Sequence, residues 1–147
     1  MLIDLTAETG SAEVLELLGY AVFGDETKAA AVASAYASGG SLGLYGWKEE
    51  GALVGLAGIE MTEDGSMEIR HLAVLPENRG RGYARGLLLE TMLARAPRYV
   101  LAESADETAA DFYRALGFMV YSLGVDASGS EWFRCVYEVE EPEEDED

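Results

Sequence analysis

A strand, a loop and a helix follow one another between residues 67 and 95, and this unit constrains the fold more than any other part of the sequence. Segment 67–75, MEIRHLAVL, first alternates polar and apolar residues and then becomes continuously apolar, as a strand entering a buried sheet does. Pro76 ends the strand, because proline has no backbone N–H to donate. A loop rich in Gly and Arg follows, and a leucine-rich helix runs from about Gly82 to Arg95.

The rest of the chain continues this pattern of strands and helices. Helices are expected at 12–20, 26–37 and 106–118, and strands at 42–48, 52–60, 98–104, 118–123 and 131–139. Ser11 and Asp106 have the side chains of helix N-caps, and Gly117 is placed to end the last helix. The alternation indicates the α/β class, with a mixed sheet covered by helices.

Leucines surround the helix at 82–95 on more than one side. Leu87 and Leu88 mark one face, and Leu89 and Leu93 lie beside it. Such spacing predicts that the helix is buried over a wide arc.

The length and the charge limit the classes of partner. With 147 residues the chain has the length of one domain, which we expect at 1–139, followed by an acidic tail at 140–147. The formal net charge is −18, and EVEEPEEDED, from Glu138 onward, holds eight acids and no base. Excess negative charge disfavours nucleic acid as a partner, because phosphate binding needs a basic surface. It is compatible with a cationic substrate such as an amine.

Other features indicate a cytoplasmic protein without a metal. No apolar run approaches the ~18 residues that a membrane span needs, so no membrane partner is expected. The N-terminus MLIDLTAETG has no basic region typical of a secretory signal. A single cysteine, Cys135, and a single histidine, His71, argue against a disulfide or a metal site. Cys135 is expected to pack in the core.

One stretch of this negatively charged chain is positively charged, at the start of the helix at 82–95. Residues 78–89 contain three arginines and no acid. The first turn of a helix leaves backbone N–H groups without partners and carries partial positive charge. Gly80 and Gly82 have no side chain that would keep an anion away. The composition indicates a phosphate-type site; a glycine-rich loop with surface arginines is the alternative.

Two familiar nucleotide motifs fail here at specific positions. GRGYARG, residues 80–86, reads G-x-G-x-x-x-G and misses the dinucleotide fingerprint G-x-G-x-x-G by one position. No G-K-S or G-K-T follows, so the loop of nucleoside triphosphatases is excluded as well.

The stretch resembles motif A of the GNAT superfamily of N-acetyltransferases, whose core is Arg/Gln-x-x-Gly-x-Gly/Ala. In LAVLPENRGRGYARGLL, residues 72–88, Arg79, Gly82 and Ala84 occupy the defined positions. AADFYRALGF, residues 109–118, is similar to motif B of the same family, in which a Tyr precedes x-x-x-Gly-Phe. The resemblance covers residues 67–122 and is only topological over residues 1–60.

The resemblance implies a GNAT-like fold, with a central mixed, mostly antiparallel sheet flanked by helices, and acetyl-CoA as the acetyl donor. Backbone N–H groups from Arg81 to Ala84 would hold the pyrophosphate. Leu72 and Val74 would pair with the pantetheine arm as an added strand does, and the Val74 N–H would point at the thioester oxygen. The cofactor-binding residues that it implies are Leu72, Ala73, Val74, Arg79, Gly80, Arg81, Gly82, Tyr83, Ala84, Asp106 and Tyr113.

The activity that the resemblance implies is acetyl transfer to a primary amine. Tyr113 stands at the family's acid position, so we expect it to protonate the leaving thiolate. A phenol of pKa ~10 donates uphill to a thiolate of pKa ~8.5, unless arginines or a helix terminus polarise the phenol. A core aromatic is the alternative role for Tyr113.

Glu68 is our first candidate for the base that takes the amine proton. It lies four residues before Leu72, so the period of two places both side chains on one face of the strand. Glu60, Glu103 and His71 compete with it, although alternation places His71 on the opposite face and favours a structural role there. Asp106 stands where the family often has Asn, so helix capping is its expected role.

The sequence does not specify the acceptor or the oligomeric state, and it is compatible with two other functions. A non-catalytic acyl-CoA-binding module keeps the acetyl-CoA site, and an acidic interaction protein would bind another anion in the loop. The acceptor is expected to be a small-molecule amine or a peptide amine. Trp47 and Trp132 are expected to pack, with Tyr45 and Trp132 as candidate lining of an acceptor pocket. An exposed edge at the C-terminal strands would allow a homodimer.

Overall fold

The computed structural model describes residues 1–22 and 25–139 of the chain. Within them the helices are α1 (Ala12–Ala21), α2 (Glu26–Ala37), α3 (Tyr83–Arg95) and α4 (Glu107–Ala115). The strands are β1 (Leu2–Asp4), β2 (Leu42–Glu49), β3 (Ala52–Met61), β4 (Met67–Val74), β5 (Tyr99–Ser104), β6 (Met119–Val125) and β7 (Glu131–Glu138). The acidic tail expected at 140–147 lies outside the described residues.

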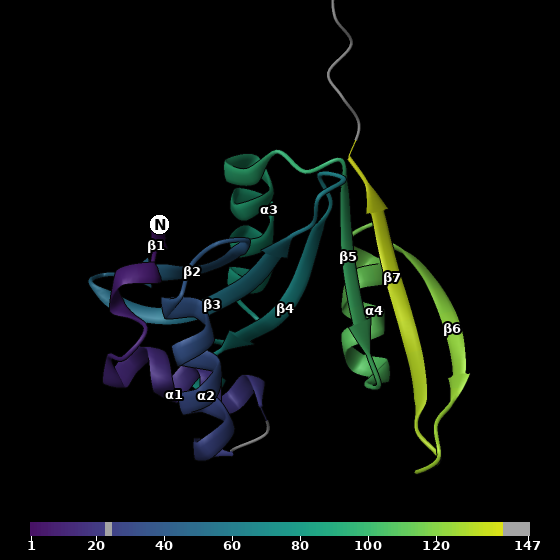
Figure 1. Cartoon of the computed structure of the whole chain (residues 1–147), viewed down its shortest axis with the longest axis horizontal. Coiled ribbons are helices and arrows are strands. Elements are labelled where there is room, and N and C mark those ends of the chain that lie inside the picture. The colour runs from purple at the N-terminus through teal and green to yellow at the C-terminus, as the bar shows by residue number, and fades with distance from the viewer. Residues whose placement is uncertain (23–24, 140–147) are drawn as a thin grey trace, which may run out of the picture.

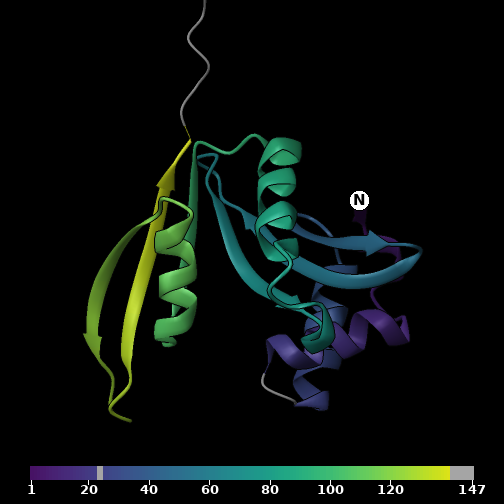
Figure 2. The same cartoon turned by 180° about the vertical axis from the view of Figure 1, so that it is seen from behind.

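The strands described at 1–22 and 25–139 form one seven-stranded sheet in the order β1-β2-β3-β4-β5-β7-β6. Every neighbouring pair is antiparallel except β4 and β5, which are parallel. Helices α1 and α2 lie on one face, and α3 and α4 lie on the other (Figures 1 and 2). This arrangement confirms the fold class expected from the sequence, a mixed and mostly antiparallel sheet flanked by helices. β1 was not expected.

The sheet divides in the middle, between its two parallel strands. β4 pairs with β5 only from Met67 to Ile69, although β4 continues to Val74. β5 keeps its other neighbour, β7, as far as Ser104. The two strands therefore diverge beyond Ile69 (Figures 1 and 2). One edge of β4 is left without a neighbouring strand along this opening.

Each face of the sheet has its own hydrophobic core. The core on the α3 and α4 side contains Tyr45, Ala57, Ile59, Met67, Ile69, Leu87, Leu88, Val100, Ala102, Tyr113, Phe118 and Cys135. The core on the α1 and α2 side contains Leu5, Val14, Leu17, Leu18, Ala29, Ala33, Tyr36, Leu44, Leu53, Leu56 and Ala73. Strands β3 and β4 contribute to both cores, because successive side chains point to opposite faces. Cys135 is buried, as expected.

The helix ends follow the capping residues of the sequence. Ser11 accepts a hydrogen bond from the Val14 N–H, and Asp106 accepts one from the Thr108 N–H, so both expected N-caps are confirmed. Asp25 caps α2 in the same way. Gly117 has a φ of 98° immediately after α4, as the expected end of that helix requires.

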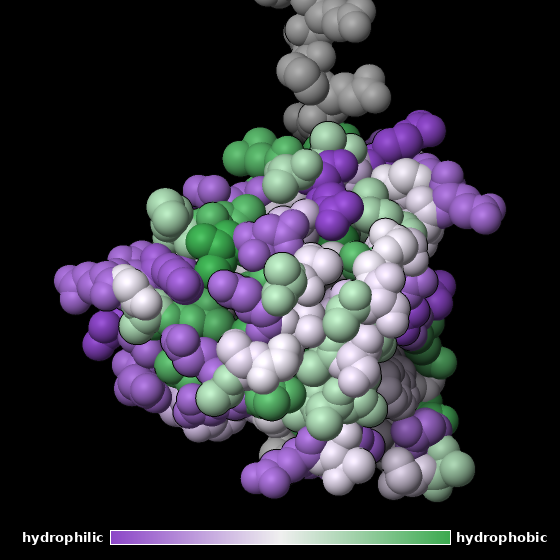
Figure 3. Space-filling model, turned by 60° about the vertical axis from the view of Figure 1, so that its left-hand side comes forward, coloured by the Kyte–Doolittle hydropathy of each residue, from purple (hydrophilic) through white to green (hydrophobic). Residues whose placement is uncertain are grey.

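Helix α3 is buried on one side only, so the wide arc of burial expected from its leucines is wrong. Leu87 and Leu88 are buried, but Leu89 is 47% exposed and Leu93 is 81% exposed. The reason is that α3 packs on the sheet and no other helix of the described residues covers its outer side (Figure 2). On the face shown in Figure 3, patches of apolar side chains are broken up by polar ones.

The two tryptophans also differ from each other. Trp47 packs against the core on the α3 side, where its ring lies over Gly86. Trp132 is 39% exposed and donates its ring N–H to Asp126, so the expectation that it packs is wrong. Between residues 1–22 and 25–139, no helix is long and apolar enough to cross a membrane.

Candidate functional site

The loop before α3 presents backbone N–H groups at the start of that helix. Gly82 is the N-cap and has no side chain to accept from the first turn. The first helical hydrogen bond runs from the Gly86 N–H to the Gly82 carbonyl, at 3.0 Å. The N–H groups of Tyr83, Ala84 and Arg85 therefore have no acceptor within the helix. Together with the helix dipole, they form a site for an anion.

Two glycines give the loop its shape. Gly80 has a φ of 79° and Gly82 a φ of 81°, in the left-handed region that other residues adopt only at a cost. A Cβ on either glycine would meet no protein atom within 4 Å. Glycine is thus required here by the backbone conformation and not by neighbouring side chains. The space outside the loop is open to an incoming group.

The three arginines of the loop do not have the same role. Arg79 donates its Nε–H to the carbonyl of Val74 at 3.0 Å, and its guanidinium carbon lies 5.7 Å from the centre of the Tyr20 ring. Arg79 therefore ties the loop to the end of β4 and to α1. Arg81 and Arg85 are exposed, and among the described residues neither forms an ion pair. They supply the positive charge expected beside an anion.

The open edge of β4 carries backbone groups that face the opening. The Leu75 N–H donates to the Val54 carbonyl at 2.9 Å, toward β3. Because backbone groups alternate along a strand, the N–H groups of Val74 and Leu72 point to the other side, where β5 has turned away. Arg79 reaches the Val74 carbonyl from that same side. This is the geometry that an added extended chain needs.

Tyr113 lies on α4 in the core on the α3 and α4 side. Its side chain is 6% exposed and contacts Phe112 and Phe118, with ring centres 5.3 and 5.1 Å away. Burial, with a smaller effect of Cys135, raises the pKa of the Tyr113 hydroxyl above its usual range. This burial works against the donation of its proton.

A β-bulge in β4 overturns the expected position of Glu68. His71 pairs with Gly58 and Ile69 pairs with Ile59, so Arg70 is an extra residue in the ladder. The extra residue shifts the alternation of side chains between the two faces by one position, so the pattern before Arg70 does not continue after it. Glu68 and Leu72 thus lie on opposite faces, and Glu68 shares the α1 and α2 face with His71. The argument from a period of two was wrong because it assumed a regular strand.

The bulge gathers charged side chains on this face. The Arg70 Nη2 lies 2.6 Å from Glu60 Oε2, and its Nε lies 3.7 Å from Glu68 Oε1. Glu60 is thereby held closely, while Glu68 is held only loosely. Glu68 lies near the point where β4 leaves β5, since Ile69 is the last paired residue.

Tyr36 completes the cluster, and the sequence interpretation missed it. Its hydroxyl lies 2.7 Å from His71 Nδ1, and the two rings meet edge to face. Gly58 makes this contact possible, because a Cβ there would collide with the Tyr36 hydroxyl. A single Tyr in an alanine-rich helix carries no local signal of such a role.

The other candidates are separated from this cluster. Glu103 accepts two hydrogen bonds from Arg134, at 3.0 and 2.6 Å, on β5 and β7. Tyr45 lies on β2 and receives the Nε–H of Arg95, whereas Trp132 lies on β7. Three strands separate β2 from β7 in the sheet, so Tyr45 and Trp132 do not line a common pocket.

The sheet thus places the expected site residues on two sides of one opening. Tyr113 and the side chain of Leu72 belong to the α3 and α4 face. Glu68 and His71 belong to the α1 and α2 face. The gap between β4 and β5 is the connection between the two faces.

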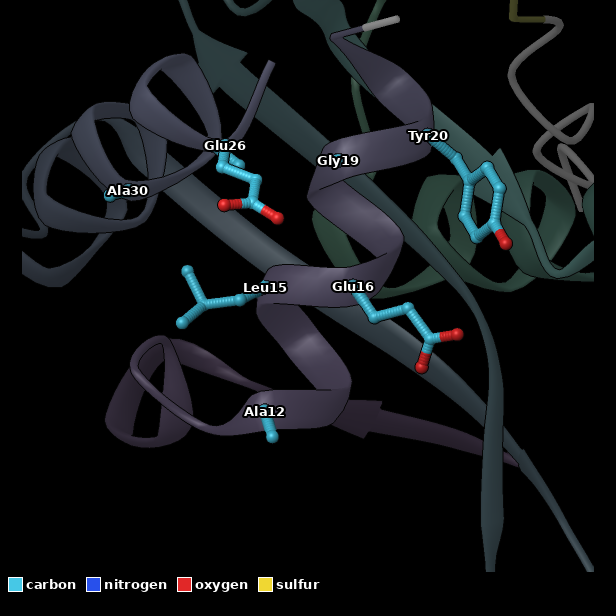
Figure 4. Close-up of a pocket in the computed structure, with 8 residues that line it drawn as sticks. Ala12, Leu15, Glu16, Gly19, Tyr20, Glu26 and Ala30 are labelled. Carbon is cyan, nitrogen blue, oxygen red and sulfur yellow. The ribbon is translucent and has the colours of Figure 1, made fainter. Parts of the chain in front are cut away.

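A pocket of about 570 Å³ lies elsewhere, along α1 and α2. Leu15 and Glu26 lie between these helices, and Glu16 and Tyr20 extend from the other side of α1 (Figure 4). None of the site residues expected from the sequence lines it. Tyr20 links it to the loop before α3, because the Arg79 guanidinium lies over the Tyr20 ring.

Within residues 1–22 and 25–139, no group of three or more His, Cys, Asp or Glu side chains is placed to hold a metal ion. The geometry therefore offers two features: an anion site at the start of α3 and an unpaired strand edge beside it.

Several solved structures have the same fold as this chain. A Desulfovibrio desulfuricans protein assigned to the GNAT family of acetyltransferases is 17% identical, with a TM-score of 0.79 over 94% of this chain and 98% of that one. A GNAT family acetyltransferase from Elizabethkingia anophelis with acetyl-CoA bound is 16% identical, with a TM-score of 0.71 over 95% and 97%. An aminoglycoside 6'-acetyltransferase type Ii is 15% identical, with a TM-score of 0.76 over 97% and 99%.

Among curated proteins, none matches the sequence of this chain. The family model of the acetyltransferase (GNAT) domain matches residues 41–120, which include β2 to β5, α3, α4 and the loop between β4 and α3. This match spans more than half of the chain and includes the anion site and the open edge of β4. The protein therefore belongs to the GNAT family of acetyltransferases.

Proposed function

We propose that this protein is an N-acetyltransferase that transfers the acetyl group of acetyl-CoA to a primary amine by direct attack in a ternary complex. The observation that carries the proposal is the divided sheet. The unpaired edge of β4 lies next to the N–H groups that begin α3. The hydrogen bond from Arg79 to the Val74 carbonyl holds the loop against the end of the strand. A thioester with a long polar arm and a diphosphate fits these two features together.

The residues of the loop and of the strand edge fit this donor at each part. The N–H groups of Arg81, Gly82, Tyr83 and Ala84 would hold the diphosphate, with Gly80 shaping the loop. Leu72, Ala73 and Val74 would hold the extended arm along the strand edge. The Val74 N–H would donate to the thioester oxygen, where negative charge develops during the reaction. Arg79 would position the loop, and acetyl-CoA supplies the activated acetyl group.

The chain's own side chains would move two protons. In the reaction an ammonium acceptor first loses one proton, its nitrogen then bonds to the acetyl carbon, and the carbon–sulfur bond breaks. The nitrogen loses a second proton after the attack, which balances the proton that the thiolate gains. Glu68 would take the amine proton, since an alkylamine of pKa ~10.4 is almost entirely protonated at neutral pH. Tyr113 would give its proton to the thiolate. Its burial makes this donation harder, so contact with the sulfur must compensate.

The charge of the protein supports a cationic acceptor. The formal net charge is −18. On the α1 and α2 face, where Glu68 would meet the acceptor, Glu60 and Glu68 share the guanidinium of Arg70. An ammonium group would therefore meet an excess of negative charge. One structural neighbour is an aminoglycoside 6'-acetyltransferase, which supports an amine as the acceptor class. Cytoplasmic location and a homodimer remain predictions.

A second candidate is a non-catalytic acyl-CoA-binding module. The burial of Tyr113 and its raised pKa favour this candidate, because they weaken the leaving-group acid. Such a module would use the same loop and the same strand edge.

Steady-state release of CoA separates the two. The full-length protein is given acetyl-CoA and a panel of polyamines, amino sugars and peptide amines, and the thiol that appears is measured. Acetyl-CoA binding is measured separately by thermal shift, where a ligand at 100 times its Kd adds about 2.7 kcal/mol to the free energy of unfolding. Turnover with any amine supports the enzyme. Binding without turnover supports the module, and the absence of both overturns the acetyl-CoA site itself.

A further inference from the structure

The hydrogen bond between Tyr36 and His71 is built into the fold from three elements. Tyr36 belongs to α2, His71 to β4, and Gly58 of β3 leaves the space that the Tyr36 hydroxyl fills. Tyr36 is only 2% exposed, so its hydroxyl depends on protein partners. Among the described residues, His71 Nδ1 is the partner within hydrogen-bond distance. A contact this specific holds the imidazole in one orientation.

The direction of this hydrogen bond follows from which group carries the hydrogen, the Tyr36 hydroxyl or His71 Nδ1. The Tyr36 hydroxyl has one hydrogen, and burial raises the pKa of Tyr36 above its usual range, so it keeps that hydrogen. If Nδ1 were the donor, the hydroxyl hydrogen would have no acceptor among the described residues. Tyr36 therefore donates, and Nδ1 accepts. The neutral His71 ring then carries its own proton on Nε2.

The surroundings keep this ring neutral. Burial, and to a lesser extent the neighbouring Arg70, lower the pKa of His71 from its usual value of 6.5. The charged groups near this pair are Arg70 and Glu60, and Glu68 lies 3.7 Å from the Arg70 Nε. The positive charge of Arg70 therefore adds to burial in disfavouring the protonated imidazole.

The bulge places this donor beside the expected base. Glu68 pairs with Glu60 and His71 pairs with Gly58, so the two side chains share a face and stand two ladder positions apart. Two positions correspond to roughly 7 Å between backbones along the strand, so the two side chains are long enough to come within reach of one bridging water molecule. Both residues border the opening, because the pairing of β4 with β5 ends at Ile69.

We propose that His71 is a positioning residue on the amine side of the reaction, where its Nε2–H holds the water that carries the amine proton to Glu68. The water accepts the hydrogen bond of Nε2–H, receives the proton of the amine and gives one of its own to Glu68. The imidazole gains and loses nothing in this step. His71 is therefore a donor and not the base, since its Nε2 already carries a proton. The role rests on the proposed acetyl transfer.

The protonation of His71 is measured directly by NMR. His71 is the only histidine in the sequence, so the imidazole ¹⁵N signals of the full-length protein are unambiguous. At neutral pH we expect an unprotonated Nδ1 and a protonated Nε2. Tyr36→Phe keeps the ring but removes the hydroxyl, and should let both neutral forms appear. Tyr121→Phe, on exposed β6, is the matched control and should change neither signal. A proton on Nδ1 in the wild-type protein overturns the inference.

Kinetics test the role in the reaction. His71→Leu should lower kcat about tenfold, the effect of one hydrogen bond, with unchanged affinity for acetyl-CoA. His71→Gln offers an N–H donor again and should recover part of this loss. Both variants should keep the limb of the pH–rate profile that Glu68→Gln removes. Loss of that limb in His71→Gln would make His71 the base, and unchanged turnover in His71→Leu would make it structural; either result overturns the proposal.

Failure of the proposed function leaves a different signature. If the wild-type protein turns over no amine, the proposed function fails and the positioning role fails with it, whatever the NMR signals show. If amines are acetylated but Nδ1 carries the proton, only the inference on His71 fails.

Discussion

The two sides of the opening between β4 and β5 are built in different ways. On the α3 side, the loop at 79–86 uses consecutive residues: two glycines of positive φ and the backbone N–H groups that start a helix. On the α2 side, the cluster of Tyr36, Glu60, Glu68, Arg70 and His71 comes from one helix and two strands. A bulge at Arg70 brings these side chains together.

Because of this difference, we assign acetyl-CoA binding to the loop and the selection of the acceptor to the cluster of side chains. The first side consists of backbone groups, which any sequence with glycines at the right positions provides. The second side consists of side chains, so it can vary without disturbing the loop. We therefore expect substitutions in the loop at 79–86 to change acetyl-CoA affinity, and substitutions in the α2-side cluster to change turnover or the stability of the cluster.

The largest effect is expected for Gly82→Glu. A carboxylate in front of the helix N-terminus repels an anion and denies it several charge-assisted hydrogen bonds, so acetyl-CoA affinity should fall at least about 100-fold. Gly129→Glu is the matched control, since Gly129 also has a positive φ, of 89°, and open space around it. Isothermal titration measures both. Equal affinity in the two variants would remove the loop from the binding site.

Tyr113→Phe should lower kcat about 100-fold, in the range of a lost general acid, while acetyl-CoA affinity stays within about twofold. The substitution keeps the aromatic packing with Phe118. Tyr137→Phe is the control from the same cluster, because Tyr137 also lies beside Phe118, with 5.3 Å between ring centres. Steady-state turnover with an accepted amine is the measurement. A similar loss in both variants would point to packing and not to proton donation.

Gly58→Ala tests the packing of the α2 side. The added Cβ would collide with the Tyr36 hydroxyl, so the free energy of unfolding should fall by about 1–3 kcal/mol. Gly19→Ala, in α1, meets no atom within 4 Å and should raise it by about 0.5–1 kcal/mol. Denaturant unfolding gives both values. A neutral Gly58→Ala would mean that Tyr36 does not hold its position over β3.

Asp106→Ala should cost about 1 kcal/mol of stability through the lost N-cap of α4, whereas Asp106→Asn keeps a capping oxygen and should cost little. Asp25→Ala, which removes the N-cap of α2, is the parallel case. Thermal unfolding compares the three variants. If Asp106→Ala also weakened acetyl-CoA binding while Asp25→Ala did not, Asp106 would have the cofactor role that the family resemblance implies.

The smallest effect is expected from the titration of His71. Its pKa is lowered in the folded protein, so the unfolded chain takes up a proton first as the pH falls through about 6.5. The stability that neutral His71 contributes is therefore complete above this pH and declines below it. His71→Gln should show a flatter loss of stability between pH 7 and pH 5 than the wild-type protein. Parallel curves would contradict the lowered pKa.

The local conformations that the sequence predicted correctly are those that depend on neighbours along the chain. The Gly-Arg loop, the helix that follows it and the Asp106 cap each result from a few consecutive residues. Their conformation depends on backbone preferences and on hydrogen bonds within a turn. The same holds for the order of strands and helices after β1, and for the fold class.

Tertiary structure decided which side chains face each other. The bulge at Arg70 reversed the alternation that placed Glu68 with Leu72, and nothing in MEIRHLAVL marks it, because a bulge depends on the pairing with β3. The exposure of Leu89 and Leu93 depended on whether a second layer covers α3. The contact between Tyr36 and His71 spans 35 residues and needs the gap at Gly58. Local sequence determines conformation over one or two turns, whereas strand pairing and packing join distant residues and so decide the chemistry of this site.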